Sequence, residues 1–353
     1  MIASISLLTS LIIIFGLFLL GFLLTYPVIS RASGKKMVLA LLPIFAFIMF
    51  LPLLIPSAGG STLNKLLRFV LFLPLFNFIL RSVDLAFQKK YSPEKVISFR
   101  DYLRHHSLTF ASQDQADPDR KPDIKRGMYY FFSGIGYILA AGFLILIGTY
   151  FRLEEWSYPI SVVAKMIYFF LFANAAAQFN YGYSRLAGRE ITPIFNEPLR
   201  AYSAEDFWSN RMNVNIRQYF VRFIFLPLGG PKRQELGIMA TFLASGIVHE
   251  YQMDVSSLNP AGFGYILIFF LIHGLAVITE HRFKRYLRKN HRPFYDRASR
   301  NRALPYLLIP FFAALITSTS AIGLKSFDLI VNFHNIEFVK KLLAILPLPP
   351  FPV

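Results

Sequence analysis

The sequence predicts an all-α, polytopic integral membrane protein with about 8–10 transmembrane helices and some shorter re-entrant or interfacial segments. Hydrophobic residues occupy 55% of its 353 positions. Charged residues make up only 16%, against roughly 25% in an ordinary soluble domain. The apolar residues also cluster in runs of about 20, the length that crosses a bilayer as a helix. A soluble domain of this size needs a polar surface, and this chain lacks the residues to make one.

Eight apolar runs are the candidate transmembrane helices. The first, residues 3–29, has no charged residue before Arg31, and we interpret it as a membrane span rather than a cleaved signal peptide. Two shorter runs, 216–228 and 338–348, are expected to be re-entrant, interfacial or fully buried. No soluble domain is left over, so we expect a single membrane-embedded domain over residues 1–353. The other long runs are 37–56, 66–87, 128–151, 159–181, 236–253, 262–280 and 303–324.

The formal net charge of +17 is concentrated in the loops between these runs. In a soluble protein such a charge suggests nucleic acid, but here the pattern is typical of topology signals and anionic-lipid contacts, and no nucleic-acid partner is expected. Loop 281–302 holds nine Lys or Arg residues and one acid, Asp296. Alternation through the eight runs places this loop and loops 88–127 and 182–235 on one side. The positive-inside rule then predicts that the N-terminus lies outside and that these loops are cytosolic.

Missing residues and motifs exclude several kinds of chemistry. The chain has no Cys, which excludes disulfides, Cys-ligated zinc, iron–sulfur clusters and a Cys nucleophile. It has no G-x-S-x-G elbow and no phosphate-binding loop of the G-x-x-x-x-G-K-[ST] type. Glu250 follows His249, but Met253 interrupts an H-E-x-x-H zinc motif, so no metal site is predicted. Acidic residues within the runs are few, which weakens the case for an ion-coupled transporter.

His249 is the strongest candidate for chemistry among the seven histidines. It lies in the apolar stretch 238–251 beside Glu250, and an ionisable residue at mid-bilayer costs about 2.5–3.5 kcal/mol. Imidazole accepts a proton near neutral pH, so the functional interpretation is a general base in a cavity. The structural alternative is a buried histidine bonded to a backbone carbonyl, or an interfacial pair.

His273 occupies a comparable apolar position, with Glu280 two helical turns later on nearly the same face. For His273 a helix-packing hydrogen bond is the expected role. Four other histidines are expected in polar loops: His105 and His106 solvated in a charged loop, and His281 and His291 in the basic loop, near lipid headgroups.

Two ordered motifs resemble the central signature of plant-type wax synthases, which belong to the membrane-bound O-acyltransferase (MBOAT) superfamily. The first combines T-P-I-F-N-E-P-L at 192–199 with S-A-E-D-F-W-S-N-R-M-N at 203–213, similar to the family pattern F-W-x-x-R-W-N. The second is S-G-I-V-H-E at 245–250, followed by H-G at 273–274 and Glu280. The resemblance covers about residues 180–285. Met212 stands where the family usually has Trp, a departure that bears on tunnel shape and acceptor identity.

The resemblance implies a multi-helix fold around a central tunnel, with an acyl-CoA thioester entering from the cytosol and a lipophilic alcohol as acceptor. His249 matches the family's catalytic histidine, and Asn213 matches its second active-site polar residue. Acyl-CoA is then a co-substrate, and no cofactor is expected. Substrate-binding roles are expected for Phe207, Trp208, Arg211, Ser245, Glu250 and His273.

The chemistry of these side chains agrees with the resemblance. His249 can take the proton of the acceptor hydroxyl, and Asn213 can donate to the developing oxyanion. Glu250 is not expected to contact His249, because adjacent helical residues diverge by about 100°. Two alternatives stay open: an MBOAT enzyme that modifies an exported glycan, glycolipid or peptide, and a non-enzymatic lipid or solute transporter in which His249 is structural or gates the pathway.

Overall fold

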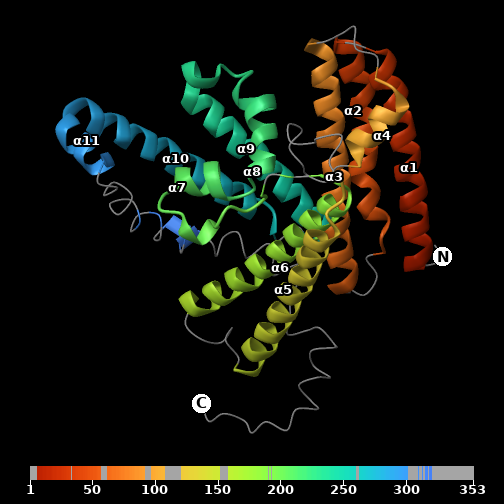
Figure 1. Ribbon diagram of the computed structural model, residues 1–353, viewed down its shortest axis with the longest axis horizontal. Helices are drawn as coiled ribbons and strands as arrows, with labels where there is room; N and C mark the ends of the chain where they lie inside the picture. Colours follow the sequence, from red (N-terminus) through yellow and green to blue (C-terminus); the bar gives the residue numbers. More distant parts are fainter. Residues whose placement is uncertain are drawn as a thin grey trace. The chain divides into compact units, whose positions relative to one another are not determined.

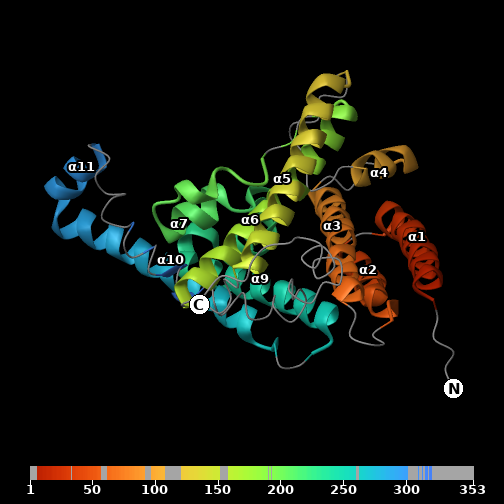
Figure 2. The ribbon, with the colours of Figure 1, turned by 90° about the horizontal axis from the view of Figure 1, so that it is seen from below.

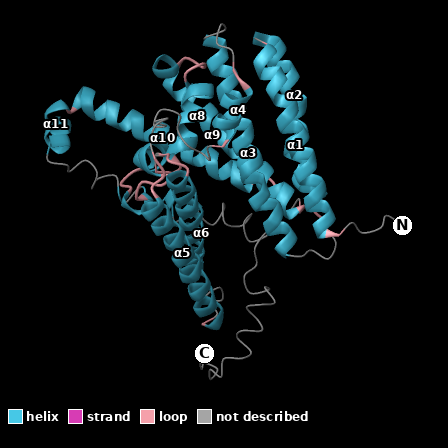
Figure 3. Ribbon diagram, turned by 45° about the vertical axis from the view of Figure 1, so that its right-hand side comes forward, coloured by secondary structure: helices cyan, strands magenta, loops and turns pink. Residues whose placement is uncertain are grey.

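The part of the chain that the computed structural model describes is built from helices. The described residues are 6–32, 34–56, 62–91, 97–107, 121–151, 158–189, 191, 193–259 and 262–300, together with 309, 312, 315, 316, 318 and 319. Within these residues the regular elements are helices and no strand occurs (Figure 3). The predicted fold class, an all-α polytopic membrane protein, is confirmed.

Figure 1 shows the long helices together with short helical elements, most of which stand between α6 and α9. In chain order the elements are α1 (Leu7–Arg31), α2 (Gly34–Phe50), η1 (Leu51–Leu54), α3 (Thr62–Tyr91), α4 (Phe99–His106), α5 (Ile124–Tyr150), α6 (Tyr158–Leu186), η4 (Pro198–Arg200), α7 (Ala204–Asp206), η5 (Phe207–Arg211), α8 (Val214–Phe220), η6 (Val221–Phe225), η7 (Gly230–Arg233), α9 (Gln234–Ser257), α10 (Tyr265–Asn290) and α11 (Arg292–Arg300). The turns η5 and η6 are π-helical.

Five described helices are long and apolar enough to cross a membrane. They are Leu7–Arg31, Lys36–Leu54, Leu63–Lys89, Ile124–Gly148 and Tyr265–Asn290. The runs 159–181 and 236–253 also form helices, α6 and α9, but polar residues such as Asn174 and Gln178 reduce the apolarity of α6. The short run 216–228 lies in α8, η6 and the turn that follows, as expected for a segment that does not span. Run 303–324 lies largely, and run 338–348 wholly, outside the described residues.

Contacts divide the chain into two units. One comprises Met1–Phe110 and Tyr251–Ala261, and the other comprises Ala111–Glu250 and Gly262–Val353. The division passes through α9 between Glu250 and Tyr251, so the last turns of that helix belong to the first unit. The site described below is built from residues of the second unit.

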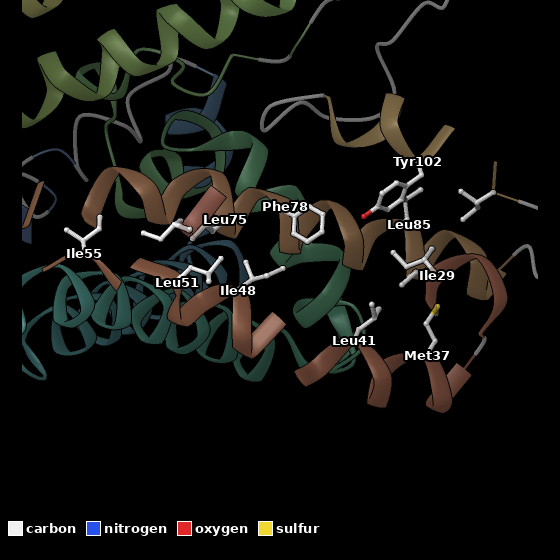
Figure 4. Packing of buried hydrophobic residues seen from close by; sticks show 13 residues of the cluster. Ile29, Met37, Leu41, Ile48, Leu51, Ile55, Leu75, Phe78, Leu85 and Tyr102 are labelled. Carbon is white, nitrogen blue, oxygen red and sulfur yellow. The ribbon is translucent and has the colours of Figure 1, made fainter. Parts of the chain in front are cut away.

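The first unit packs α1, α2, η1, α3 and α4 around one apolar cluster (Figure 4). Lipid tails are as apolar as these side chains, so in a membrane the cluster is held by close van der Waals packing more than by the hydrophobic effect. The labelled members are Ile29, Met37, Leu41, Ile48, Leu51, Ile55, Leu75, Phe78, Leu85 and Tyr102.

Arg68 of α3 is a buried cation that binds the carboxyl ends of two other helices. Its Nη2 donates to the carbonyl oxygen of Ile55, at the end of η1, at 2.9 Å, and its Nη1 donates to the carbonyl oxygen of Ser256, in the last turn of α9, at 3.2 Å. The last carbonyl groups of a helix lack partners within the helix and carry a partial negative charge. The guanidinium therefore satisfies groups that the bilayer interior would leave unpaired.

Two more cations of α3 act in the same way. Nε of Arg81 donates to the carbonyl oxygen of His105 at 3.1 Å, at the end of α4. Nζ of Lys89 donates to the carbonyl oxygen of Ile29 at 2.9 Å, in the last turn of α1. The side chains of Arg81 and Lys89 are buried. Thus α3 supplies the cationic cap for several helices of its unit.

The prediction that His105 and His106 are solvated is wrong. The residues form the end of α4, an amphipathic helix whose Tyr102 is fully buried. The ring of His106 lies between Tyr102 and Phe78, with centroid distances of 4.2 and 4.9 Å. Its Nε2 lies 3.0 Å from Ser82 Oγ. The segment is rich in charged residues and was therefore expected to be a solvated loop, but it forms a helix with one apolar face.

In the second unit α5 and α6 run side by side along most of their length (Figures 1 and 2). Small residues allow this close approach: a Cβ added to Gly182 would meet the carbonyl oxygen of Gly127 at 3.0 Å. Further along, Phe131 and Phe179 form an edge-to-face pair with centroids 5.0 Å apart. Small residues facing each other are a common basis for helix association in membranes.

Candidate active site

His249 lies on α9 with one ring nitrogen fixed by the helix itself. Its Nδ1 is 2.8 Å from the carbonyl oxygen of Ser245, one turn earlier. A carbonyl oxygen only accepts hydrogen bonds, so Nδ1 carries the proton and Nε2 of the neutral ring is the acceptor. The side chain is half-buried, and Nε2 has no hydrogen-bond partner among the described residues. This arrangement leaves a proton acceptor at a partly accessible position.

Glu250, the next residue, points elsewhere and caps α10. Its Oε1 accepts from the N–H of Gly264 at 2.7 Å, and its Oε2 accepts from the N–H of Leu267 at 2.8 Å. A carboxylate at a helix N-terminus satisfies unpaired N–H groups and complements the helix dipole. The absence of a direct contact with His249 agrees with the divergence expected for adjacent residues. The substrate-binding role of Glu250 stays a prediction, and both carboxylate oxygens are engaged in the cap.

An aromatic ring of α10 packs against His249, and a second ring from η5 packs on the first. Phe270 of α10 packs at a tilt against the imidazole with ring centroids 4.7 Å apart, and Trp208 of η5 packs on Phe270 at 5.4 Å. Gly246 permits this approach of α9 to α10, because an added Cβ would meet the Cβ of Phe270 at 3.2 Å and a side-chain atom of Leu267 at 2.9 Å. The result is an apolar wall on one side of the candidate base.

His273 has both ring nitrogens engaged. Trp208 Nε1 donates to its Nδ1 at 3.0 Å, and its Nε2 lies 2.9 Å from Thr319 Oγ1. The hydroxyl of Thr319 donates to the carbonyl oxygen of Leu315 at 2.6 Å, so His273 Nε2 must be the donor to Thr319. The ring is fully buried. The helix-packing hydrogen bond expected for His273 is confirmed, and no lone pair is left to accept a proton.

Phe207 and Arg211 lie at the two ends of the π-helical turn η5. Phe207 is buried and packs edge-to-face on Trp208, with centroids 5.0 Å apart. Nε of Arg211 is bonded to Oδ2 of Asp206, whose Oδ1 accepts from Asn210 Nδ2 at 3.1 Å. Arg211 therefore anchors the turn, and its predicted substrate contact is not tested. Single π turns within helices are frequent at functional sites.

Asn213 follows this turn in the left-handed conformation, with φ +47° and ψ 51°. Asn adopts this region more readily than most residues. Backbone hydrogen bonds hold the segment, with Val214 N–H donating to the carbonyl oxygen of Ile194 at 3.0 Å. Within the described residues the Asn213 side chain makes no hydrogen bond, to His249 or to another residue. Its predicted role stays untested.

A charged network joins α7 to the polar end of α10. Glu205 Oε1 lies 2.9 Å from His281 Nε2, and its Oε2 accepts from Lys284 Nζ at 2.7 Å. Glu280 accepts from Lys284 Nζ at 2.6 Å and from the N–H of Glu205 at 3.0 Å. Bonding to His281, together with the charge of Lys284, lowers the pKa of Glu205 to about 2. His281 is thus half-buried in an ion-pair network, not exposed to headgroups as predicted.

Sequence reasoning missed three residues of this site. Phe270 lies one turn before His273 on α10, so helical spacing could have placed both on one face. Asp206, the partner of Arg211, stands inside the recognised motif. Thr319 lies 46 positions after His273, and no local signal connects them.

Residues 191–272 match the family model described as the membrane bound O-acyl transferase family. This segment is similar to that family over about a quarter of the chain. It contains Trp208, Asn213, His249 and Phe270, and it lies within the region where the motifs resembled wax synthases. The resemblance to the O-acyltransferase superfamily is therefore confirmed.

Curated proteins from Arabidopsis thaliana are similar to this region of the chain. Probable long-chain-alcohol O-fatty-acyltransferase 1 is 34% identical over 119 residues, covering 31% of this chain and 35% of the relative. Probable long-chain-alcohol O-fatty-acyltransferase 2 is 32% identical over 111 residues, covering 29% and 32%. Probable long-chain-alcohol O-fatty-acyltransferase 7 is 28% identical over 109 residues, covering 28% and 32%. The matched region spans about a third of each relative's length.

Proposed function

We propose that this protein is an O-acyltransferase that moves a fatty acyl chain from acyl-CoA to the hydroxyl group of a long-chain alcohol. The observation that carries the proposal is the hydrogen bond from His249 Nδ1 to the Ser245 carbonyl, because it leaves Nε2 ready to accept a proton. The names of the Arabidopsis relatives support the choice of acceptor. The enzyme works with no cofactor, and acyl-CoA is its co-substrate.

The reaction needs one proton acceptor. The alcohol oxygen attacks the thioester carbonyl carbon while His249 Nε2 takes the hydroxyl proton. The tetrahedral intermediate then collapses, the C–S bond breaks, and the imidazolium returns the proton to the departing thiolate. The products are an ester and free CoA, and the histidine is restored to its starting form. No covalent enzyme intermediate is required, which agrees with the absence of Cys.

The residues around His249 position the substrates and stabilise the charge that develops during the reaction. The rings of Phe270 and Trp208 offer an apolar surface against His249 on which an acyl chain or alcohol can lie. In this proposal the Asn213 amide donates to the oxyanion, a neutral donor that avoids the desolvation cost of a charge. Cytosolic Lys and Arg residues hold the CoA phosphates through charge-assisted hydrogen bonds.

The test is release of free CoA by the purified protein in nanodiscs. Acyl-CoAs of graded chain length are offered with and without a panel of long-chain alcohols, and ester is quantified in parallel. The variant is His249→Ala, and the matched control is His291→Ala, which removes an exposed imidazole that contacts Tyr286. Loss of general-base catalysis lowers the rate by about 10²–10⁴. We expect that loss for His249→Ala and an unchanged rate for the control.

Three outcomes would contradict the proposal. If His249→Ala keeps the wild-type rate, the base is another group. If CoA is released equally without alcohol, the protein hydrolyses thioesters. If a folded wild type gives no turnover with any lipid alcohol, the acceptor class is wrong, and glycans, glycolipids and peptides are the acceptors to try next.

A further inference from the structure

We propose that the end of α10 and the start of α11 form a binding surface for anionic lipid headgroups. This inference is independent of the proposed reaction. The surface, called here the basic–aromatic surface, consists of Arg285, Arg288, Lys289 and Arg292 together with Phe283, Tyr286 and Phe294.

The length of α10 places these cations beyond the apolar part of the helix. Its 26 residues extend about 39 Å, whereas a hydrocarbon core of about 30 Å is crossed by about 20 residues. Counted from Tyr265, the twentieth residue is Lys284. Arg285, Arg288 and Lys289 therefore follow directly after a membrane-spanning length, at the level where headgroups begin.

Most of the positive charge of this surface is not neutralised by carboxylates among the described residues. No carboxylate among the described residues pairs with Arg288 or Lys289, and both side chains are exposed. Arg285 donates a long hydrogen bond of 3.5 Å to the amide oxygen of Gln234, and Glu235, the carboxylate on which its charge acts, is already engaged by Arg282. Nε of Arg292 lies 3.8 Å from Oδ2 of Asp296, with both side chains exposed to solvent screening.

The adjacent basic residues have a different use. Arg282 forms a two-point pair with Glu235 of α9, and Lys284 binds Glu205 and Glu280. Those cations hold the fold together. The cations from Arg285 onward extend past this network, and their contacts with Gln234 and Asp296 are long and exposed, so their excess charge is available for an external anion.

Exposed aromatic rings between the cations favour a membrane surface over a soluble anion. Phe283, Tyr286 and Phe294 are 43%, 54% and 51% exposed. Aromatic side chains gather at the headgroup level of bilayers, where part of the ring meets hydrocarbon and part meets water. A free phosphate ion has no apolar surface for these rings to contact. Basic clusters beside a transmembrane helix, in contrast, attract anionic lipids, whose acyl chains can contact the rings. Charge and apolar area together match a bilayer interface.

The experiment titrates the full-length protein in detergent with phosphatidylglycerol or phosphatidylcholine and counts bound lipids by native mass spectrometry. The variant is the triple substitution Arg285→Gln, Arg288→Gln, Lys289→Gln. The matched control is Lys121→Gln, Lys125→Gln, Arg126→Gln, which removes the same charge from exposed positions at the start of α5. Each basic residue near an anionic surface contributes about fivefold in affinity. We expect the variant to bind phosphatidylglycerol at least about tenfold more weakly and the control to bind like wild type.

Other results would overturn the inference. Equal losses in the variant and the control would mean that net charge, and not this surface, governs binding. Equal affinity of the wild type for phosphatidylcholine would exclude headgroup charge as the determinant. Displacement of phosphatidylglycerol by free CoA would assign the surface to a soluble phosphate. If the triple variant does not fold, Arg288→Gln alone must weaken binding by about fivefold, and wild-type affinity in that variant counts against the proposal.

Discussion

The indole Nε1 of half-buried Trp208 donates a 3.0 Å hydrogen bond to Nδ1 of the fully buried His273, so the side chains from η5 and α10 hold each other in place. Because His273 also donates to Thr319, its ring has no lone pair to offer. His249 contacts the same aromatic group through Phe270, but its ring keeps a lone pair on Nε2 that can accept a proton. Two histidines with similar sequence surroundings therefore have different chemical capacities, and the difference lies in their hydrogen bonds.

Replacing Trp208 by Phe tests this relationship. The substitution keeps an aromatic ring against Phe270 and leaves the buried Nδ1 of His273 without a donor, which costs about 1–3 kcal/mol. We expect a lower melting temperature in detergent and a lower acyl-transfer rate, since the ring against Phe270 is no longer held by a hydrogen bond to His273. Tyr286→Phe, which removes an exposed hydroxyl, is the control and should melt like wild type. A Trp208→Phe protein as stable as wild type would mean that this bond does not hold the site together.

Replacing Glu250 by Gln tests the cap on α10. An amide has one acceptor oxygen where the carboxylate has two, so either Gly264 or Leu267 loses its N–H partner. A helix cap is worth about 1 kcal/mol, which predicts roughly fivefold faster amide exchange over residues 264–268. Glu235→Gln on the same helix is the matched control, because Glu235 bonds to the side chain of Arg282 instead. Unchanged protection of residues 264–268 would contradict the cap.

The long apolar helices were predictable, since a bilayer requires about 20 successive apolar residues. The prediction for α10 ended at residue 280, whereas the helix continues to Asn290, because Lys, Arg and Leu are good helix formers outside the membrane as well. The error over α4 had a different origin. Its charged composition suggested a solvated loop, but Tyr102 and His106 are four residues apart and share a buried face.

The partners within the candidate site were less predictable than its position. His249 was identified because an ionisable side chain in an apolar stretch is costly. Glu250 binds backbone N–H groups, which nearly every residue carries, so no residue pattern marks Gly264 or Leu267 as its partners. The bond between Trp208 and His273 joins residues 65 positions apart and depends on how η5 folds.

The network around Glu205 predicts a pH dependence of stability. His281 and Lys284 lower the pKa of Glu205 to about 2, whereas the unfolded chain has a value near 4.5. The folded protein therefore keeps this carboxylate ionised where the unfolded chain binds a proton, and the stabilisation is complete above about pH 4.5 and lost as the pH falls towards 2. We expect Glu205→Gln to melt below wild type at neutral pH, with the gap closing across that acidic range. The exposed Glu197→Gln should show no such gap. A gap that stays constant down to pH 3 would assign the effect to packing, not to the charge.

Arg68 provides the sharpest test of the first unit. Arg68→Met preserves most of the side-chain volume but leaves the carbonyl oxygens of Ile55 and Ser256 without donors, at about 1–3 kcal/mol for each buried group. We expect a marked drop in melting temperature, with Arg68→Lys intermediate because one ammonium group reaches fewer acceptors than a guanidinium fork. Arg104→Met makes the same change at an exposed position of α4 and should melt like wild type. If Arg68→Met and Arg104→Met have the same melting temperature, the buried guanidinium is dispensable for stability. The carbonyl groups at the ends of η1 and α9 then have other hydrogen-bond donors.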